Sequence, residues 1–286
     1  MEKKTDVIRN AVLEEFREYL MEKESSALTM KKYMRDVKTF FEFAGEGSEI
    51  TKEMLLAYKE WLLGRYAVSS ANSMIAALNQ FLSFQELGRL KLKRIRVQRA
   101  DIDQMEKMLT REEFRRLVRK AREDNKQQLA VMMETMGATG VRVSELKFFC
   151  AENVRSGMVK VWNKGKYRLV ILPAALRKRL LFYMKKNNIR SGLIFRTRTG
   201  KAKNRSNIWK EMKMIAGRAE VSLRKVFPHN LRHLFARAFY KETKNMLNLA
   251  DILGHSSLEV TRIYASDGLS EWKKNIERVK LIEMTT

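Results

Sequence analysis

The stretch 157-GMVKVWNKGKYRLVILP-173 decides the fold class, because the hydrophobic pattern of the chain changes there. Two short β-prone runs flank the turn-forming letters NKGK, and Pro173 ends the second run. This arrangement is typical of an antiparallel hairpin. The other apolar patterns have helical spacing, and we find no internal repeat and no low-complexity tract. The sequence therefore predicts a mainly α fold with one small antiparallel β-hairpin or sheet.

Helical spacing predicts a bundle of about four helices before the hairpin. One lies within residues 7–23, and the others lie in TMKKYMRDVKTFFEFAG (29–45), ITKEMLLAYKEWLLG (50–64) and SSANSMIAALNQFLSFQELG (69–88). Later in the chain, Thr110 and Glu113 form the pattern of a capping box at a helix start. Further helices are predicted near residues 125–136, 174–187, 203–218, 230–240 and 246–253.

The composition favours a polyanionic partner. Lys and Arg number 58 against 33 Asp and Glu, so the formal net charge of the 286 residues is +25. Nucleic acid is the leading candidate partner and a membrane surface is the alternative. No run is long and apolar enough to span a membrane, and the N-terminus does not resemble a signal peptide, so we expect a cytoplasmic protein. The single cysteine, Cys150, excludes an internal disulfide and a cysteine-cluster metal site, and we expect it to be structural.

The positive charge is unevenly distributed. Residues 1–86 have a net charge of −2 and residues 110–286 a net charge of +23. Between them, GRLKLKRIRVQRA (88–100) alternates apolar with basic residues, which predicts a DNA-contacting linker over 88–106 or, alternatively, an edge strand. On the helix of 29–45 a basic stripe recurs at helical spacing; it indicates either a DNA contact or a solvated face. The candidate DNA-binding residues are Lys31, Arg35, Lys38, Lys91, Lys93, Arg94, Arg96 and Arg99.

Several polar residues of the larger block occupy positions that a purely structural role does not readily explain. Taken singly, each has an ordinary reading as a surface arginine, a helix cap or a packed tyrosine. One arginine follows the glycine turn GATG, a histidine and an arginine share a helical face in PHNLRH, and a lysine lies at the hairpin tip. In LGHSSLEVTRIYAS (253–266), a histidine follows the glycine that ends a helix, and Ser256 with Glu259 predicts a capping box for the helix that carries a tyrosine. These residues are Arg142, Lys164, His229, Arg232, His255 and Tyr264.

This combination fits phosphoryl transfer without a metal. Two arginines can clamp the nonbridging oxygens of a phosphate, where transition-state charge must be stabilised. A tyrosine can act as the nucleophile and form a covalent phosphotyrosyl intermediate. A lysine or histidine can protonate the leaving 5′ oxygen. The scheme requires neither ATP nor magnesium, so we expect no cofactor and no metal.

The motifs TGVRVSEL, WNKGKYRL, PHNLRHLFA, LGHSS and TRIYA occur in the order and approximate spacing of the tyrosine recombinases, the phage-integrase family. The chain resembles the short Xer-type members most, with an archaeal member as one candidate. The resemblance implies a SAM-like core-binding, DNA-binding domain over 1–87, the basic linker over 88–106, and a catalytic domain with a C-terminal tail helix over 107–286.

The resemblance also implies a role for each site residue. Arg142 and Arg232 would bind the scissile phosphate, and His255 would hydrogen-bond it. Lys164 would be the general acid, with Lys166 as a rival because the hairpin is shorter than the family's usual one. His229 would be an acid or base near the nucleophile, Tyr264. Glu145 would orient its neighbours, and His233 would be structural.

The implied function is site-specific recombination through a 3′-phosphotyrosyl intermediate and a Holliday junction, in the manner of Xer-type chromosome-dimer resolution. Its partner would be double-stranded DNA with specific recombination sites, bound by a homotetramer in a nucleoid-associated setting; the free protein could be a monomer or a dimer. The tetramer follows from an amphipathic tail after Tyr264, which packs either into a neighbouring protomer or onto its own domain. The alternatives are a mobile-element integrase, a type IB-like topoisomerase and a non-catalytic DNA-binding protein.

Overall fold

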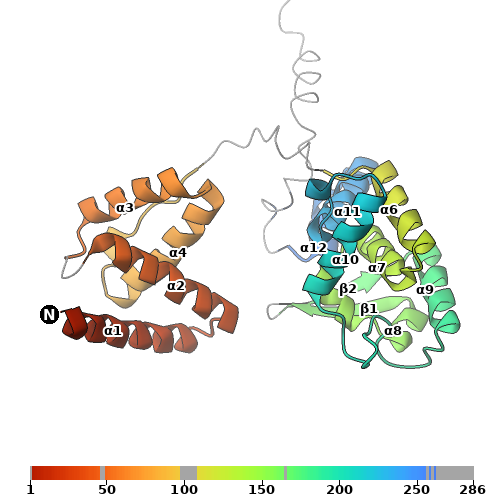
Figure 1. Ribbon diagram of the computed structural model, residues 1–286, viewed down its shortest axis with the longest axis horizontal. Helices are drawn as coiled ribbons and strands as arrows, with labels where there is room; N and C mark the ends of the chain where they lie inside the picture. Colours follow the sequence, from red (N-terminus) through yellow and green to blue (C-terminus); the bar gives the residue numbers. More distant parts are fainter. Residues whose placement is uncertain are drawn as a thin grey trace, which may run out of the picture. The chain divides into compact units, whose positions relative to one another are not determined.

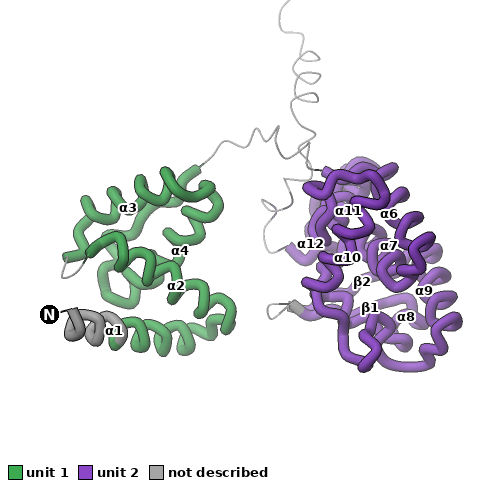
Figure 2. The backbone as a smooth tube through the Cα atoms, viewed as in Figure 1, with its two compact units in different colours: residues 1–99 green, residues 100–286 purple. Residues whose placement is uncertain are grey.

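The chain forms two compact units, residues 1–99 and 100–286 (Figure 2). The computed structural model describes residues 2–45, 49–96, 108–163, 166–255, 258 and 261, with the backbone alone in residues 2–10, 163 and 166. Each unit has its own hydrophobic core. The finer division into 1–87, 88–106 and 107–286 stays a prediction.

The first unit is a four-helix bundle, as predicted (Figure 1). Its core is largely aromatic: the Phe16 and Phe81 rings meet edge to face with centroids 5.3 Å apart, and the Phe40 and Tyr58 rings do so at 5.1 Å. Edge-to-face packing of this kind adds to the stabilisation from burial. The helices are α1 (Glu2–Glu22), α2 (Ala27–Ala44), α3 (Lys52–Arg65) and α4 (Val68–Phe84). The Thr51 side chain caps α3 by accepting a hydrogen bond from the Met54 amide.

The basic segment after α4 packs on this first unit as far as the structure describes it. It begins with a 3₁₀ turn, η1 (Gly88–Leu90), and continues without regular structure. Leu92 is buried in the core. The Asn79 side chain donates to the Leu92 carbonyl and accepts from the Leu92 amide, and the Asn72 side chain makes the same pair of hydrogen bonds with Ile95. The segment therefore turns its apolar residues inward and its basic residues outward, as the alternation predicts.

The second unit is built around α7 (Gln127–Thr139), which is buried along most of its length and packs against four other helices. The capping box at Thr110 and Glu113 is present at the start of the first of its helices. The remaining helices are α6 (Arg111–Glu123), α8 (Ala151–Ser156), α9 (Ala174–Lys186), α10 (Arg205–Arg218), α11 (Pro228–Thr243) and α12 (Met246–Leu253), with 3₁₀ turns η2 (Val143–Phe148) and η3 (Leu223–Lys225).

The predicted hairpin consists of β1 (Met158–Asn163) and β2 (Lys166–Ile171), paired antiparallel (Figure 1). Its register runs from Met158 opposite Ile171 to Asn163 opposite Lys166. Val159, Val161 and Val170 face the core. Because side chains alternate along a strand, the residues between them face outward.

Gly140 ends α7 in a left-handed conformation, with φ +66°, and brings α7 close to α11 and α12. A Cβ atom at this position would lie 2.5 Å from Cδ1 of Phe235 and 2.8 Å from Cδ2 of Leu253. Both the backbone angle and the close approach therefore require glycine here.

We expect Gly140→Ala to destabilise the second unit more than Gly192→Ala does. Gly192 has a similar φ of +70°, but a Cβ atom added there would have no neighbouring atom within 4 Å, so its substitution isolates the backbone cost. That cost is about 1–2 kcal/mol. Gly140→Ala adds an overpacking cost of about 1–3 kcal/mol. Urea unfolding of the two variants measures the difference, and equal losses of stability would contradict the close approach.

Candidate active site

Arg142 lies where α7 gives way to η2, two residues after Gly140. Its backbone amide donates a hydrogen bond to Oε2 of Glu145 at 2.7 Å, and its Nη1 donates to Oε1 of the same carboxylate at 3.0 Å. The Arg142 side chain keeps 31% of its surface exposed, whereas that of Glu145 is 1% exposed. Glu145 therefore holds a guanidinium that still reaches the surface.

Arg168 of β2 is the second cation on Glu145, and sequence reasoning missed it. Its Nη2 donates to Oε2 of Glu145 at 2.9 Å, and its Nε donates to the carbonyl of Ile252 in the last turn of α12 at 3.0 Å. Burial lowers the pKa of the Arg168 guanidinium, and the charge of Glu145 opposes that shift. A signal was present in the sequence: strand alternation places this arginine on the same inward face as Val170.

Arg232 is the largest fully buried side chain of the described residues, with 1% of its surface exposed. Its Nη1 donates to the carbonyl of Gly140 at 2.8 Å, and its Nη2 donates to the carbonyl of Leu253 at 2.7 Å. These carbonyls end α7 and α12, where the helix dipole places partial negative charge. The buried cation is therefore compensated by two helix C-termini.

His255 follows Gly254, which ends α12 with φ +66° as predicted. Its Nε2 lies 2.9 Å from Nη2 of Arg232, and its Nδ1 lies 2.8 Å from Oγ1 of Thr261. A guanidinium can only donate, so Nε2 must accept, which assigns the proton to Nδ1. Burial, followed by the charges of Arg232 and Arg142, lowers the pKa of His255 to about 4. The imidazole is thus neutral near neutral pH.

His229 and His233 occupy successive turns of α11, the helix that carries Arg232. Their rings meet edge to face, with centroids 4.5 Å apart and planes at 83°. Burial is the first cause that lowers the pKa of both, followed for His229 by Arg232 and Arg142, and for His233 by His229; the pKa of His233 falls to about 4. The structure thus places His229 in the electrostatic field of the arginine cluster.

Some predicted site residues lie outside the described part of the chain. Lys164, which follows β1 in the sequence, is one of them, and for its rival Lys166 only the backbone is described. The predicted nucleophile Tyr264, Arg99, the Ser256 and Glu259 capping box and the tail helix also lie outside the described residues. The structure brings together Arg142, Glu145, His229, Arg232 and His255.

The basic stripe of the first unit lines a shallow hollow on α2 of about 470 Å³. Asp36, which is 3% exposed, lies under the stripe and pairs with Lys32 and with Arg35. The stripe residues Lys31, Arg35 and Lys38 are exposed, and so are Lys91, Lys93, Arg94 and Arg96 of the segment after α4.

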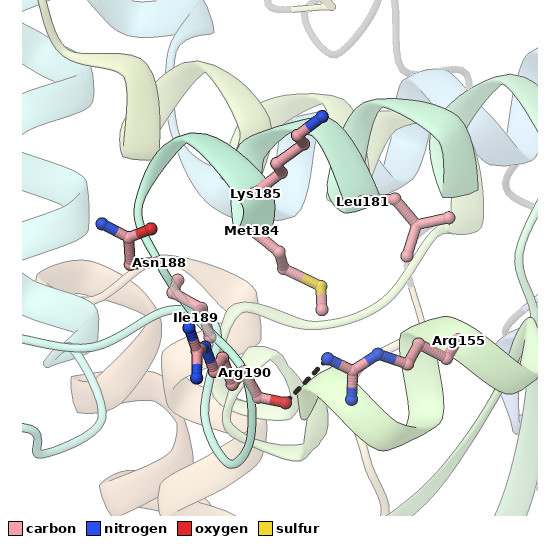
Figure 3. A pocket seen from close by; sticks show the side chains of 7 residues that line it. All are labelled: Arg155, Leu181, Met184, Lys185, Asn188, Ile189 and Arg190. Carbon is pink, nitrogen blue, oxygen red and sulfur yellow. Dashed lines mark hydrogen bonds between the residues drawn. The ribbon is translucent and has the colours of Figure 1, made fainter.

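Two further hollows lie in the second unit. One, of about 340 Å³, begins at Val143 and Ser144, directly after Arg142, and is also lined by Lys147, Lys203 and Arg205. The other, of about 310 Å³, lies between α8, α9 and the loop that follows α9, and contains none of the predicted site residues (Figure 3). There Nη2 of Arg155 donates to the carbonyl of Arg190 at 2.7 Å.

Within the described ranges, no group of three His, Cys, Asp or Glu side chains is placed to hold a metal ion. Cys150 is a free, partly buried thiol, and burial raises its pKa. None of the helices that the structure describes is long and apolar enough to cross a membrane.

The chain forms two helical units, and the second gathers arginines and histidines at the ends of α7 and α12. Residues 107–269 match the phage integrase family, and residues 13–87 match the phage integrase N-terminal SAM-like domain. The chain is 31% identical to the tyrosine recombinase XerA of Thermococcus kodakarensis, over 96% of this chain and 97% of that protein. The chain therefore belongs to the phage integrase family, which confirms the resemblance.

Solved structures confirm the fold. A XerH recombinase bound to palindromic difH substrate, in a post-cleavage complex, matches with a TM-score of 0.70 at 19% identity, over 88% of this chain and 80% of that one. A lambda integrase tetramer bound to a Holliday junction matches with a TM-score of 0.67 at 17% identity, over 89% and 76%.

We expect the stability of the second unit to fall as the pH is lowered from about 7 to about 4. Above the ordinary histidine pKa of 6.5, His233 and His255 are neutral in both states. Between 6.5 and about 4, they take up protons in the unfolded chain and stay neutral in the folded one, so acidification favours unfolding.

Urea unfolding at a series of pH values measures this dependence. His233→Asn and His255→Asn should each flatten the slope of unfolding free energy against pH between about 6.5 and 4. The first unit contains no histidine and serves as an internal reference. An unchanged slope in both variants would assign the acid sensitivity to carboxylates instead.

Proposed function

We propose that this protein cuts and rejoins DNA strands at specific sites through a 3′-phosphotyrosyl intermediate on Tyr264. The observation that carries the proposal is the convergence of Arg142, Arg232 and His255 at the ends of α7 and α12. This convergence places two guanidinium groups beside a neutral imidazole. Such a set of side chains is suited to binding one phosphodiester.

The two arginines would stabilise the transition state. In a phosphoryl transfer, charge spreads over the nonbridging oxygens, and fixed guanidinium groups stabilise it without reorganisation. Arg232 is immobilised by two carbonyls and Arg142 by Glu145, so their positions are set before DNA binds. This prior ordering is the property that makes electrostatic catalysis effective.

The covalent step requires no cofactor. The Tyr264 oxygen attacks the phosphorus, the bond from phosphorus to the 5′ oxygen breaks, and Lys164 gives a proton to the leaving oxygen. Lys166, the first residue of β2 and two positions after Lys164, is the alternative proton donor. The phosphotyrosyl bond conserves the energy of the broken phosphodiester, so a 5′ hydroxyl can reverse the reaction. His229, near the same cluster, would accept or return the tyrosine proton.

His255 would change its bonding when a phosphate arrives. In the free protein its Nε2 accepts from Arg232, and its pKa is low because of burial and neighbouring cations. A phosphodiester supplies negative charge, which favours the protonated imidazole. His255 would then donate to a nonbridging oxygen, and the Nη2 hydrogen of Arg232 that His255 no longer accepts would donate to the same phosphate while the guanidinium stays on its two carbonyls.

The DNA contacts would extend over both units. Lys31, Arg35 and Lys38 on α2 would neutralise phosphates on one side, and the exposed basic residues between 91 and 96 would continue that contact. In the second unit, the hollow lined by Lys147, Lys203 and Arg205 begins next to Arg142 and would hold the backbone beside the cleaved phosphate.

The biological role would be that of its Xer-type relatives, chromosome-dimer resolution by four protomers on two duplexes at the nucleoid. The family relation to XerA supports this role, and the lambda integrase tetramer on a Holliday junction supports the assembly. The tail after Tyr264 would join neighbouring protomers.

We expect Tyr264→Phe to abolish covalent attachment to DNA while leaving DNA affinity within about two-fold, because the phenol oxygen forms the bond but contributes little to binding. A duplex carrying chromosomal site DNA and a nick next to the cleavage point traps the adduct, which is counted by denaturing gel. Adduct formation by the Phe variant would contradict the assignment of the nucleophile. Relaxation of a plasmid without a specific site, in place of two-site exchange, would identify a topoisomerase.

Simultaneous replacement of Lys31, Arg35 and Lys38 by alanine should weaken binding to all duplexes and make it less sensitive to salt. Each lost phosphate contact lowers the slope of log K against log salt by about 0.9. Fluorescence anisotropy over a salt series measures this slope. The double variant Arg17→Ala and Lys23→Ala removes exposed charges near the end of α1 and should leave the slope unchanged. Equal losses in both variants would assign the effect to net charge alone.

A further inference from the structure

Arg168 lies on the inward face of β2, opposite Val161 on β1. Its neighbours Tyr167 and Leu169 face outward and are 70% and 52% exposed, whereas the Arg168 side chain is 12% exposed. The usual side chains of this inward face are valines. Burying a charged side chain at such a position costs desolvation free energy, so the hydrogen-bond partners of Arg168 must explain why an arginine is present.

The Arg168 guanidinium joins three parts of the second unit. Its backbone belongs to the hairpin, its Nη2 donates to Glu145 of η2, and its Nε donates to the Ile252 carbonyl of α12. The stem also packs against the turn that follows α12, because a Cβ atom at Gly254 would lie 2.7 Å from Cδ of Arg168. Arg168 therefore touches the residue that holds Arg142 and the turn that presents His255.

Stability alone does not account for an arginine at this place. The third guanidinium nitrogen, Nη1, is buried and has no hydrogen-bond partner among the described residues. A buried donor without a partner is unfavourable. A valine, as at the inward position 170, would avoid this cost but would leave the Ile252 carbonyl and Oε2 of Glu145 without the bonds from Arg168. The arginine is thus better explained by the two contacts it makes than by packing.

We propose that Arg168 is a positioning residue for strand cleavage, which sets Arg142 through Glu145 and His255 through the last turn of α12. The inference rests on the proposed recombinase function. Arg168 does not contact the reacting phosphate in this scheme. It fixes the spacing between Arg142 and His255. Misplacement of a reacting group by about 1 Å can slow catalysis by about 100-fold.

Single-turnover cleavage of the nicked duplex at saturating protein tests the proposal. Arg168→Met removes both donors, and Arg168→Lys keeps the charge but can satisfy one of the two contacts at a time. We expect both to slow adduct formation by about 10- to 100-fold, with DNA affinity and its salt dependence unchanged within about two-fold. Loss of affinity with a smaller salt slope would instead identify a direct phosphate contact and overturn the proposal.

Arg177 provides the matched control. It also donates through Nε and Nη2 to backbone carbonyls, those of Val154 and Arg155, but at α8. Arg177→Lys should alter stability in urea unfolding without changing the cleavage rate. If variants at both positions slow cleavage in proportion to their loss of stability, the role of Arg168 is structural only and the proposal fails. Arg168→Lys keeps the test available if Arg168→Met does not fold.

Two further measurements separate the routes by which Arg168 could act. In a double-mutant cycle, adding Arg168→Met to Glu145→Gln should slow cleavage less than it does in the parent protein, because both changes release Arg142. A substrate with a 5′-bridging sulfur has a leaving group that needs no proton. It should rescue Lys164→Ala but not Arg168→Met; rescue of Arg168→Met would place its effect on the hairpin lysine and overturn the proposal.

These outcomes also separate the inference from the proposed function. If the parent protein forms no covalent adduct on any site DNA, the proposed function fails. If the parent forms the adduct and the Arg168 variants form it at the parental rate, the proposed function stands and the positioning role is wrong.

Discussion

The buried charge of Arg232 is the constraint on which the second unit depends. Removing a guanidinium from water is expensive, and breaking a compensated buried charge typically costs about 3–5 kcal/mol. Here the compensation comes from the carbonyls of Gly140 and Leu253, which belong to different helices. The ends of α7 and α12 must therefore meet at α11, and Gly140 permits that meeting because a Cβ would collide with Phe235 and Leu253. The fold and the site therefore both require the ends of α7 and α12 to meet at Arg232.

A second guanidinium acts on the same turn from the other side. The last carbonyls of α12 lack partners within the helix, as helix C-termini do. Ile252 receives its hydrogen bond from Arg168 of β2, and Leu253 receives its hydrogen bond from Arg232 of α11. The turn at Gly254 is consequently fixed by two elements distant in sequence, and His255 is the next residue along the chain. Its position follows from both arginines rather than from α12 alone.

The sequence predicted what local chemistry determines. Helical spacing, the capping box at Thr110, the hairpin around NKGK and the helix end at Gly254 depend on neighbouring residues, and the structure has all four. The short elements η2 and α8 were missed, because six residues are too few for a hydrophobic period to be recognised. The grouping of Arg142, Arg232 and His255 was anticipated from the family resemblance, and their geometry was not.

Arg168 shows why the remainder could not be predicted. Strand alternation gives its inward direction, but its partners Glu145 and Ile252 are 23 and 84 residues away in sequence. Nothing local indicates that a carboxylate and a free helix carbonyl will face that strand. The burial of Arg232 is similar: an arginine one turn into a helix is ordinarily exposed, and its two carbonyl partners become visible after α7 and α12 are placed.

Burial and the positive charges of the cluster together lower the pKa of its histidines. Arg142, Arg168 and Arg232 bring three positive charges together, and Glu145 is the carboxylate that the described residues place against two of them. Burial disfavours the charged imidazole of His255, and its positive charge would also add to this excess, so its pKa falls to about 4. Under the proposed function, a bound phosphodiester would reduce this excess by one charge, from +2 to +1. Bound phosphate would therefore make protonation of His255 less unfavourable than it is in the free protein, which would link the pKa of His255 to substrate binding.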